Sequence, residues 1–176
     1  NHSFLIEKLA SECSPRQEIR ELTVNAFEAI KARSQQEDAS YAGRVIWDVD
    51  WTLLENSASD AVYKLQICDN GTGMTGEEMD TFIRKLSSSG RQQGLSGNFG
   101  VGAKITAGVQ NPYGLSYLSW VNGSGNRIWF HKDEKRDKYG LRHLDVGGGS
   151  TARWAPVDDV AKPHPVDDCG TAVTLM

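Results

Sequence analysis

Three polar side chains on one predicted helix have the types and spacing of a site for a metal ion and a water molecule. Glu21, Asn25 and Glu28 stand four and three residues apart, so they would share one side of a helix. A carboxamide oxygen is a suitable ligand for Mg²⁺, which keeps much of its coordination sphere for water and phosphate oxygens. A carboxylate one turn away could orient or deprotonate a water molecule. Taken alone, such a triplet is more often an ordinary polar helix face.

A second candidate is the segment Asp69-Asn70-Gly71-Thr72-Gly73-Met74, which directly follows an apolar run. A carboxylate at the end of a strand could accept a hydrogen bond from the exocyclic amine of adenine, and the two glycines would let the base approach the backbone. The simpler interpretation is a turn that ends a strand, because Asp, Asn and Gly are the usual residues of such turns. By itself the segment favours the turn.

A third candidate is Gly97-Asn98-Phe99-Gly100-Val101-Gly102-Ala103-Lys104, which leads into a predicted helix. Glycine-spaced backbone amides at a helix N-terminus form an anion site. Lys104 could add a positive charge near a terminal phosphate. The segment does not match the GxxxxGK[ST] pattern of the Walker loop, and Lys104 could equally be a solvated helix residue.

The elements that must position these segments follow from apolar spacing. Helical periodicity predicts a first helix over 14–34, and a capping box at Thr75 and Glu78 predicts the start of a second. Alternating and β-branched residues predict a hairpin of strands over 44–54 and 62–68. Further strands are predicted over 113–121, 127–131 and 170–176. The polar segment 87–98 should be mobile, and 145–168, rich in Gly, Pro and Asp, is expected to be a long loop.

This order predicts one α+β domain over 1–176, built as a two-layer α/β sandwich. Its sheet would be mixed but mostly antiparallel, with the helices on one face. With 23 acidic and 19 basic side chains the net charge is −4, which argues against a nucleic-acid module that relies on a basic face. No apolar run is long enough to cross a membrane, and three widely spaced cysteines indicate a reduced, cytoplasmic protein. We expect the chain to be a piece of a longer protein.

The order and spacing of the candidate segments carry more information than any one segment. Glu21-Leu22-x-x-Asn25-Ala26-x-Glu28-Ala29 is followed by Asp69-x-Gly71-x-Gly73-Met74, Gly97-x-Phe99-Gly100-Val101-Gly102 and Gly170-Thr171-x-Val173-x-Leu175. This arrangement resembles the GHKL ATPase superfamily of DNA gyrase B, heat-shock chaperones, histidine kinases and MutL-type enzymes, which share the Bergerat ATP-binding fold. The resemblance extends from about Ser14 to Met176. Asp69 to Gly90 is similar to the chaperone branch, whereas Lys104 is closer to MORC-type ATPases, so no single branch is indicated.

The resemblance implies a role for each matching residue. Asn25 would hold Mg²⁺, Asp69 would bind the adenine amino group, and Glu21 would be the general base for hydrolysis. Gly73 and Met74 would line the base pocket, and Thr171 would support Asp69 or its water. The segment from Gly100 through Val101 to Gly102 would wrap the phosphates, and residues 87–98 would form a lid over ATP. The remaining residues implied to bind ATP are Glu28, Ala29, Gly71, Ser89, Gly90, Phe99 and Lys104.

The function implied is Mg-ATP binding and ATP hydrolysis that drives lid closure and dimerisation within a larger GHKL ATPase. The domain alone would turn over slowly or not at all, since gyrase- and MutL-like relatives complete the site with a lysine from the following domain. One alternative is a binding module that holds ATP without cleaving it. Histidine-kinase-like phosphotransfer is less favoured, because those enzymes usually have Asn or His where this chain has Glu21. ATP and ADP are the expected ligands, a homodimer would depend on ATP, and the client could be protein or DNA.

Overall fold

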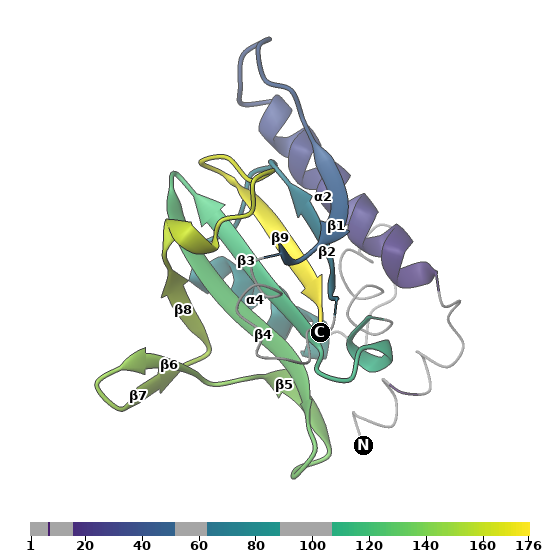
Figure 1. The fold of residues 1–176 in the computed structure, drawn as a ribbon, viewed down its shortest axis with the longest axis vertical. Helices are drawn as coiled ribbons and strands as arrows, with labels where there is room; N and C mark the ends of the chain where they lie inside the picture. Colours follow the sequence, from purple (N-terminus) through teal and green to yellow (C-terminus); the bar gives the residue numbers. More distant parts are fainter. Residues whose placement is uncertain (1–6, 8–15, 52–62, 89–106) are drawn as a thin grey trace.

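The computed structural model describes residue 7 and residues 16–51, 63–88 and 107–176. Within these residues the chain is a mixed α/β structure in which a seven-stranded sheet lies beside two longer helices (Figure 1). All the described strand pairs of this sheet are antiparallel. The predicted α+β class with a mostly antiparallel sheet is therefore confirmed.

The two longer helices show how the sequence sets a buried face and a helix start. Helix α2 (Gln17–Ser34) buries Leu22 and Ala26, which stand one turn apart on its inner side. Helix α4 (Gly76–Ser88) starts with a reciprocal cap. The Thr75 amide donates to Glu78 Oε2 over 2.8 Å, and the Glu78 amide donates to Thr75 Oγ1 over 3.3 Å. The predicted capping box is thus confirmed.

The main sheet has the order β1-β2-β9-β3-β4-β5, and β8 also pairs with β4. Its strands are β1 (Val45–Val49), β2 (Leu65–Asp69), β3 (Leu115–Val121), β4 (Ser124–Asp133), β5 (Lys138–Leu141), β8 (Trp154–Val157) and β9 (Gly170–Leu175). The predicted pairing of β1 with β2 is confirmed, with Val45 opposite Asp69. The last strand, β9, lies between β2 and β3, and every residue in it is buried. The strand nearest the C-terminus therefore lies inside the sheet, between strands that come much earlier in the chain.

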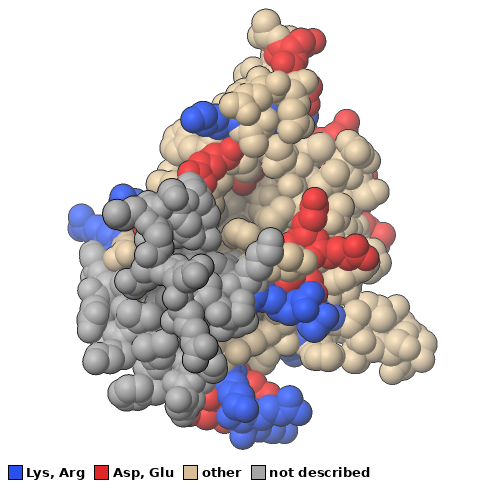
Figure 2. Space-filling view, turned by 180° about the vertical axis from the view of Figure 1, so that it is seen from behind, with Lys and Arg blue, Asp and Glu red and all other residues tan. Residues whose placement is uncertain are grey.

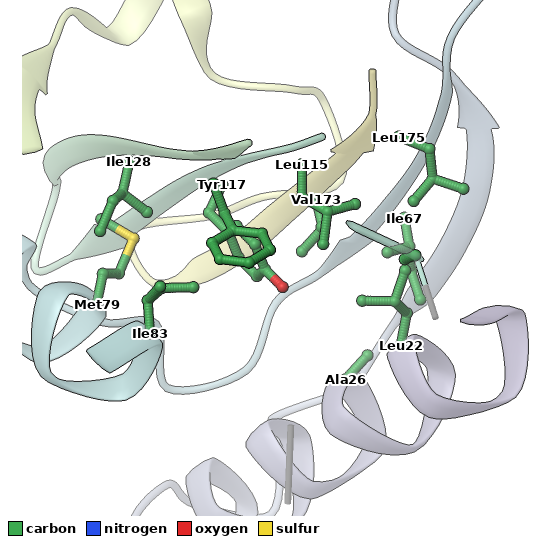
Figure 3. Packing of buried hydrophobic residues seen from close by; sticks show 12 residues of the cluster. Leu22, Ala26, Ile67, Met79, Ile83, Leu115, Tyr117, Ile128, Val173 and Leu175 are labelled. Carbon is green, nitrogen blue, oxygen red and sulfur yellow. The ribbon is translucent and has the colours of Figure 1, made fainter. Parts of the chain in front are cut away.

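Alternating strand residues build two separate apolar clusters on the two faces of the sheet. On one face, Ile67, Tyr117 and Val173 meet side chains of both α2 and α4 (Figure 3). On the other face, Cys68, Trp120 and Ala172 pack with Val166 from the segment before β9. The helices and the 158–169 segment therefore bury opposite sides of the same strands.

The prediction of a long loop over 145–168 is wrong. This range holds most of β6 (Leu144–Gly147), then β7 (Ser150–Ala152), β8 and a 3₁₀ turn, η1 (Asp159–Ala161). Gly147, Gly148 and Gly149 all have positive φ, so these glycines form the tight turn of a β6–β7 hairpin, which projects from the sheet (Figure 1). The Gly, Pro and Asp content reflects tight turns between very short strands.

Two other predicted segments extend beyond the residues that the structure describes. Helix α4 runs through Ser88, so the first two residues of the range predicted as a lid are helical and 89–98 lie outside the described residues. Of the helix predicted after Gly97, only residues 107–110 are described, and they are helical. Cys68 and Cys169 are free thiols. In the part of the chain that the structure describes, no helix combines the length and apolar character needed to span a membrane.

Candidate functional site

A cavity of about 220 Å³ lies where α2, the end of β2 and the centre of the sheet come together. Figure 2 shows the molecule hollowed on this face, beside the upper part where α2 lies. Apolar side chains from five elements form most of its wall. The lining residues are Leu22, Asn25, Ala26, Glu28, Ala29, Ile67, Asp69, Thr72, Gly73, Met74, Phe82, Tyr117, Thr171 and Val173.

Seven residues singled out from the sequence line this one cavity. They are Asn25, Glu28, Ala29, Asp69, Gly73, Met74 and Thr171. They come from α2, the end of β2, the loop before α4 and β9, which are far apart in sequence. The fold therefore brings three of the four candidate segments to one place.

The other predicted site residues stand apart from the cavity wall or from the described chain. Glu21 lies one turn before Asn25, is not part of the lining, and has Arg20 Nη1 at 3.6 Å from its Oε1. Gly71 stands behind the wall, against Ala29 of α2. The residues Ser89, Gly90, Phe99, Gly100, Val101, Gly102 and Lys104 lie outside the described residues.

Asp69 is the buried carboxylate of the cavity, 5 % exposed. Burial raises the pKa of Asp69 to about 7, although hydrogen bonds from the backbone at Gly71 and Thr171 act in the opposite direction. The Gly71 amide donates to Asp69 Oδ1 over 2.8 Å. A carboxyl group held this way can accept a hydrogen bond from a ligand when ionised, and its burial makes that bond strong.

Ser119 of β3 is a site residue that the sequence interpretation missed. Its hydroxyl is fully buried and accepts a hydrogen bond from the Met74 amide over 2.8 Å. The same oxygen lies 2.8 Å from Thr171 Oγ1 and 3.1 Å from the Gly170 carbonyl. One hydroxyl therefore fixes the loop before α4 to the strand that carries Thr171. The available signal was a serine on the strand face that carries the apolar Leu115 and Tyr117.

We expect Ser119→Ala to lower the free energy of unfolding by roughly 1–3 kcal/mol, because the partly buried Met74 amide loses its acceptor. For a chain of this size that corresponds to a fall in melting temperature of very roughly 2–4 °C per kcal/mol. Thermal unfolding measures it. Ser116→Ala in the same strand is the control, since this partly exposed serine points to the other face. Equal melting temperatures for the two variants would contradict the role given to Ser119.

Gly73 is required by the close approach of this loop to the sheet. It has φ +68°, and a Cβ on it would meet the Trp120 carbonyl carbon and the Gly170 amide nitrogen at 2.9 and 3.1 Å, with the Trp120 oxygen closer still. These neighbours are backbone atoms, which cannot turn aside as a flexible side chain can. The glycine pattern of the motif therefore has a packing reason in addition to any contact with a ligand.

Asn70, between the two motif residues Asp69 and Gly71, anchors the loop from outside. It is buried, its Oδ1 accepts from the Arg44 amide over 2.6 Å, and its Nδ2 donates to the Ala42 carbonyl over 3.0 Å. Its carbonyl accepts from Arg33 Nη1 over 2.9 Å. This network ties the end of β2 to α2 and to the segment before β1, so the carboxyl of Asp69 is held in one orientation.

The polar stripe of α2 offers oxygen ligands at the cavity. Asn25 and Glu28 both line it from successive turns. Among the described residues, no group of three or more His, Cys, Asp or Glu side chains is placed to hold a metal ion. Mg²⁺ bound together with substrate phosphates needs only one or two protein ligands, so the carboxamide of Asn25 fits such an ion.

Glu18 is a second carboxylate on the same side of α2 that the sequence interpretation missed. Half-burial raises the pKa of Glu18, while a hydrogen bond from Asn111 Nδ2 to its Oε2, 3.1 Å long, acts in the opposite direction. Glu18 stands three residues before Glu21, so the signal was an extension of the stripe by one more turn. Glu18 and Glu21 are therefore two carboxylates near the N-terminal end of α2, where the sequence interpretation named only Glu21.

The arrangement can accept an amine in a buried slot and present a carboxamide and carboxylates beside it. Comparison of the chain with protein-family models and with curated proteins finds no match to either.

Proposed function

We propose that this chain is the ATP-binding domain of a GHKL-type ATPase and that it binds Mg-ATP and contributes to its hydrolysis. The observation that supports this best is the convergence of Asn25, Asp69, Gly73 and Thr171 on one cavity. A turn-forming motif, a polar helix face and a C-terminal strand have no local reason to meet. Their meeting is what a nucleotide site built from the implied motifs requires.

The size and walls of the cavity fit a purine base. At about 220 Å³ it is smaller than the roughly 300–1,000 Å³ that encloses a whole drug-sized ligand, so it suits the base and leaves sugar and phosphates outside. Leu22, Ile67 and Val173 give apolar surface for the flat ring. Asp69 would accept the hydrogen bond of the adenine amino group.

The phosphate end would lie toward the polar stripe of α2. There Asn25 would hold Mg²⁺, which supplies charge neutralisation of the phosphates, and Glu21 would orient and deprotonate the attacking water. Glu21 is partly buried but outside the cavity wall, as a residue that serves the phosphates and not the base should be. The proposed architecture is the two-layer Bergerat sandwich, with α2 and α4 on the same face of the sheet.

Calorimetric titration with ATP, with and without magnesium, tests the binding proposal. We expect saturable binding that weakens when EDTA removes magnesium, and weaker binding of GTP, whose base has a carbonyl where adenine has an amine. The absence of heat with ATP at millimolar concentration in the presence of magnesium would overturn the proposal.

The affinity for adenosine should rise with pH through the neutral range. The pKa of Asp69 is raised from 3.8 to about 7, so folding takes up a proton between these two pH values. The stability that neutral Asp69 provides is therefore complete at low pH and is lost as the pH rises through 7. A ligand amine selects the ionised form. Binding at pH 8 should therefore be roughly tenfold tighter than at pH 6.

Adenosine is the appropriate ligand, since it has no phosphate that titrates in this range. Asp69→Asn is the control and should give a flat profile. Tighter binding at pH 6 than at pH 8 would contradict the assignment, because it would mean that a neutral Asp69 donates its proton to a ring nitrogen.

A binding module that holds ATP without cleaving it remains the second candidate. It is favoured by the ion pair of Glu21 with Arg20, in which Nη1 lies 3.6 Å from Oε1, because a carboxylate engaged by a cation is a weaker base. Lid closure and ATP-dependent dimerisation belong to the hydrolysing proposal. Phosphate release in the longer protein separates the two.

A further inference from the structure

The β4–β5 hairpin presents a second, unrelated surface at the other edge of the sheet from α2. Ile128 and Phe130 point into the helix-side core, so the residues that alternate with them point to the opposite face. On β4 these are Trp129, His131 and Asp133. His131 stands opposite Gly140, Asp133 stands opposite Lys138, and the Arg142 amide donates to the Trp129 carbonyl over 2.8 Å.

Two adjoining hollows lie over this part of the hairpin. One, of about 630 Å³, is lined by His131, Lys138, Gly140, Arg142 and His143 among others. The other, of about 330 Å³, shares His131, Asp133 and Arg142 with it and extends to Tyr113, Trp129 and Glu134. A Cβ on Gly140 would meet no atom within 4 Å, so the surface above this strand is open.

Two aromatic rings with cations beside them stand on this surface. The Arg142 guanidinium lies 4.7 Å from the centre of the Trp129 ring, and Lys64 Nζ lies 5.3 Å from that of Tyr113. Trp129 Nε1 donates to the Tyr113 carbonyl over 2.7 Å, which fixes the indole, and Tyr113 is 65 % exposed. Rigid rings with neighbouring cations are the means by which proteins stack unpaired bases and hold their phosphates.

The local charge is opposite to that of the whole chain. Residues 131–143 have a net charge of +2, whereas the chain has −4. Lys132 and Arg136 have carboxylate partners, but no carboxylate of the described residues lies within ion-pair distance of Lys138 or Arg142. Charged side chains of both signs lie at the lower tip of the molecule in Figure 2, where the end of the β4–β5 hairpin lies in Figure 1. The net acidity of the chain thus conceals a cationic surface.

We propose that this surface, formed by Lys64, Tyr113, Trp129, Lys138 and Arg142, binds single-stranded nucleic acid. Bases stack on Tyr113 and beside the Trp129–Arg142 pair, and the cations contact phosphates. The carboxylates of an acidic peptide could pair with the cations of this surface. Such a peptide would not supply an aromatic base to stack on the exposed ring of Tyr113. The proposal is independent of the nucleotide cavity, which lies on the opposite face of the sheet.

Fluorescence anisotropy of a labelled oligothymidylate of roughly ten nucleotides tests the proposal in the full-length protein. Thymine avoids competition for an adenine site, and saturating Mg-ATP can be present throughout. Each of Tyr113→Ala and Arg142→Ala should weaken binding at least about fivefold. Arg142→Ala should also reduce the slope of log affinity against log salt by about 0.7. Lys31→Ala on α2, which removes one charge at the far edge, should bind as the parent protein does.

Both surface variants should keep the Mg-ATP affinity of the parent protein, so failure here is distinct from failure of the nucleotide proposal. No binding of the oligonucleotide at roughly 50 mM salt would overturn the inference. So would binding that Tyr113→Ala leaves unchanged. Tighter binding of an acidic peptide than of the oligonucleotide would also overturn it, in favour of a protein partner.

Discussion

Replacing Glu21 by glutamine is expected to slow phosphate release from ATP by roughly 100- to 10,000-fold, the usual contribution of a general base. Glutamine keeps the size and the hydrogen-bonding oxygen of the side chain but cannot take a proton. Because Glu21 lies outside the cavity wall, Mg-ATP affinity should stay unchanged. Single-turnover phosphate release and calorimetry, both on the whole protein, measure the two quantities separately.

Glu18→Gln is the matched control on the preceding turn. Glutamine there can still accept the hydrogen bond from Asn111, so the fold and the hydrolysis rate should both be retained. The opposite pattern, loss of hydrolysis in Glu18→Gln and not in Glu21→Gln, would move the base to Glu18. Hydrolysis that survives both changes would remove the α2 carboxylates from catalysis.

Replacing Asp69 by asparagine is expected to weaken ATP binding by roughly 10- to 150-fold, since a hydrogen bond to a charged group contributes about 1.5–3 kcal/mol. Asparagine can still accept from the Gly71 amide, so the loop should keep its shape. The melting temperature should not fall, because the buried carboxyl is replaced by a group that carries no charge to desolvate. Calorimetry and thermal unfolding of the same sample measure the two effects.

The chain provides a close control for this substitution. Asp145 of β6 accepts from the amide two residues ahead, Gly147, over 2.8 Å, which repeats the bond between Asp69 and Gly71 at an exposed position. Asp145→Asn should therefore leave ATP binding unchanged. Equal affinities for Asp69→Asn and Asp145→Asn would refute the adenine assignment.

The parts of the fold that the sequence predicted are those fixed by local chemistry. The capping box of Thr75 and Glu78, the hairpin of β1 and β2 and the final strand all depend on residue types close together in the chain. The strands within 145–168 were missed because each is only three or four residues long. The β6–β7 hairpin is too short to give a periodic pattern, and β8 pairs with β4, which is distant in sequence. The β8 residue Trp154, for example, packs on Gly76 at the start of α4, a contact that no local pattern contains.

The residues of the candidate site also fall into those that local motifs predicted and those that only the fold reveals. Asp69, Asn25 and Thr171 were proposed because they belong to spaced motifs, and the structure places them around one cavity. Ser119 and Asn70 were missed because their importance comes from partners far away in sequence. Ser119 accepts a hydrogen bond from the Met74 amide, and Asn70 accepts one from the Arg44 amide. A sequence pattern identifies what could touch a ligand more readily than what holds those residues in place.

The most direct test of the account is a titration of the ¹⁵N-labelled protein with adenosine, followed by backbone amide chemical shifts. If the base occupies the cavity, the amides of Gly71, Gly73 and Thr171 should shift saturably, and those of Gly148 and Gly149 in the β6–β7 turn should not. Saturable shifts confined to other parts of the chain, or no shifts at millimolar adenosine, would contradict the central claim that this cavity is an adenine site.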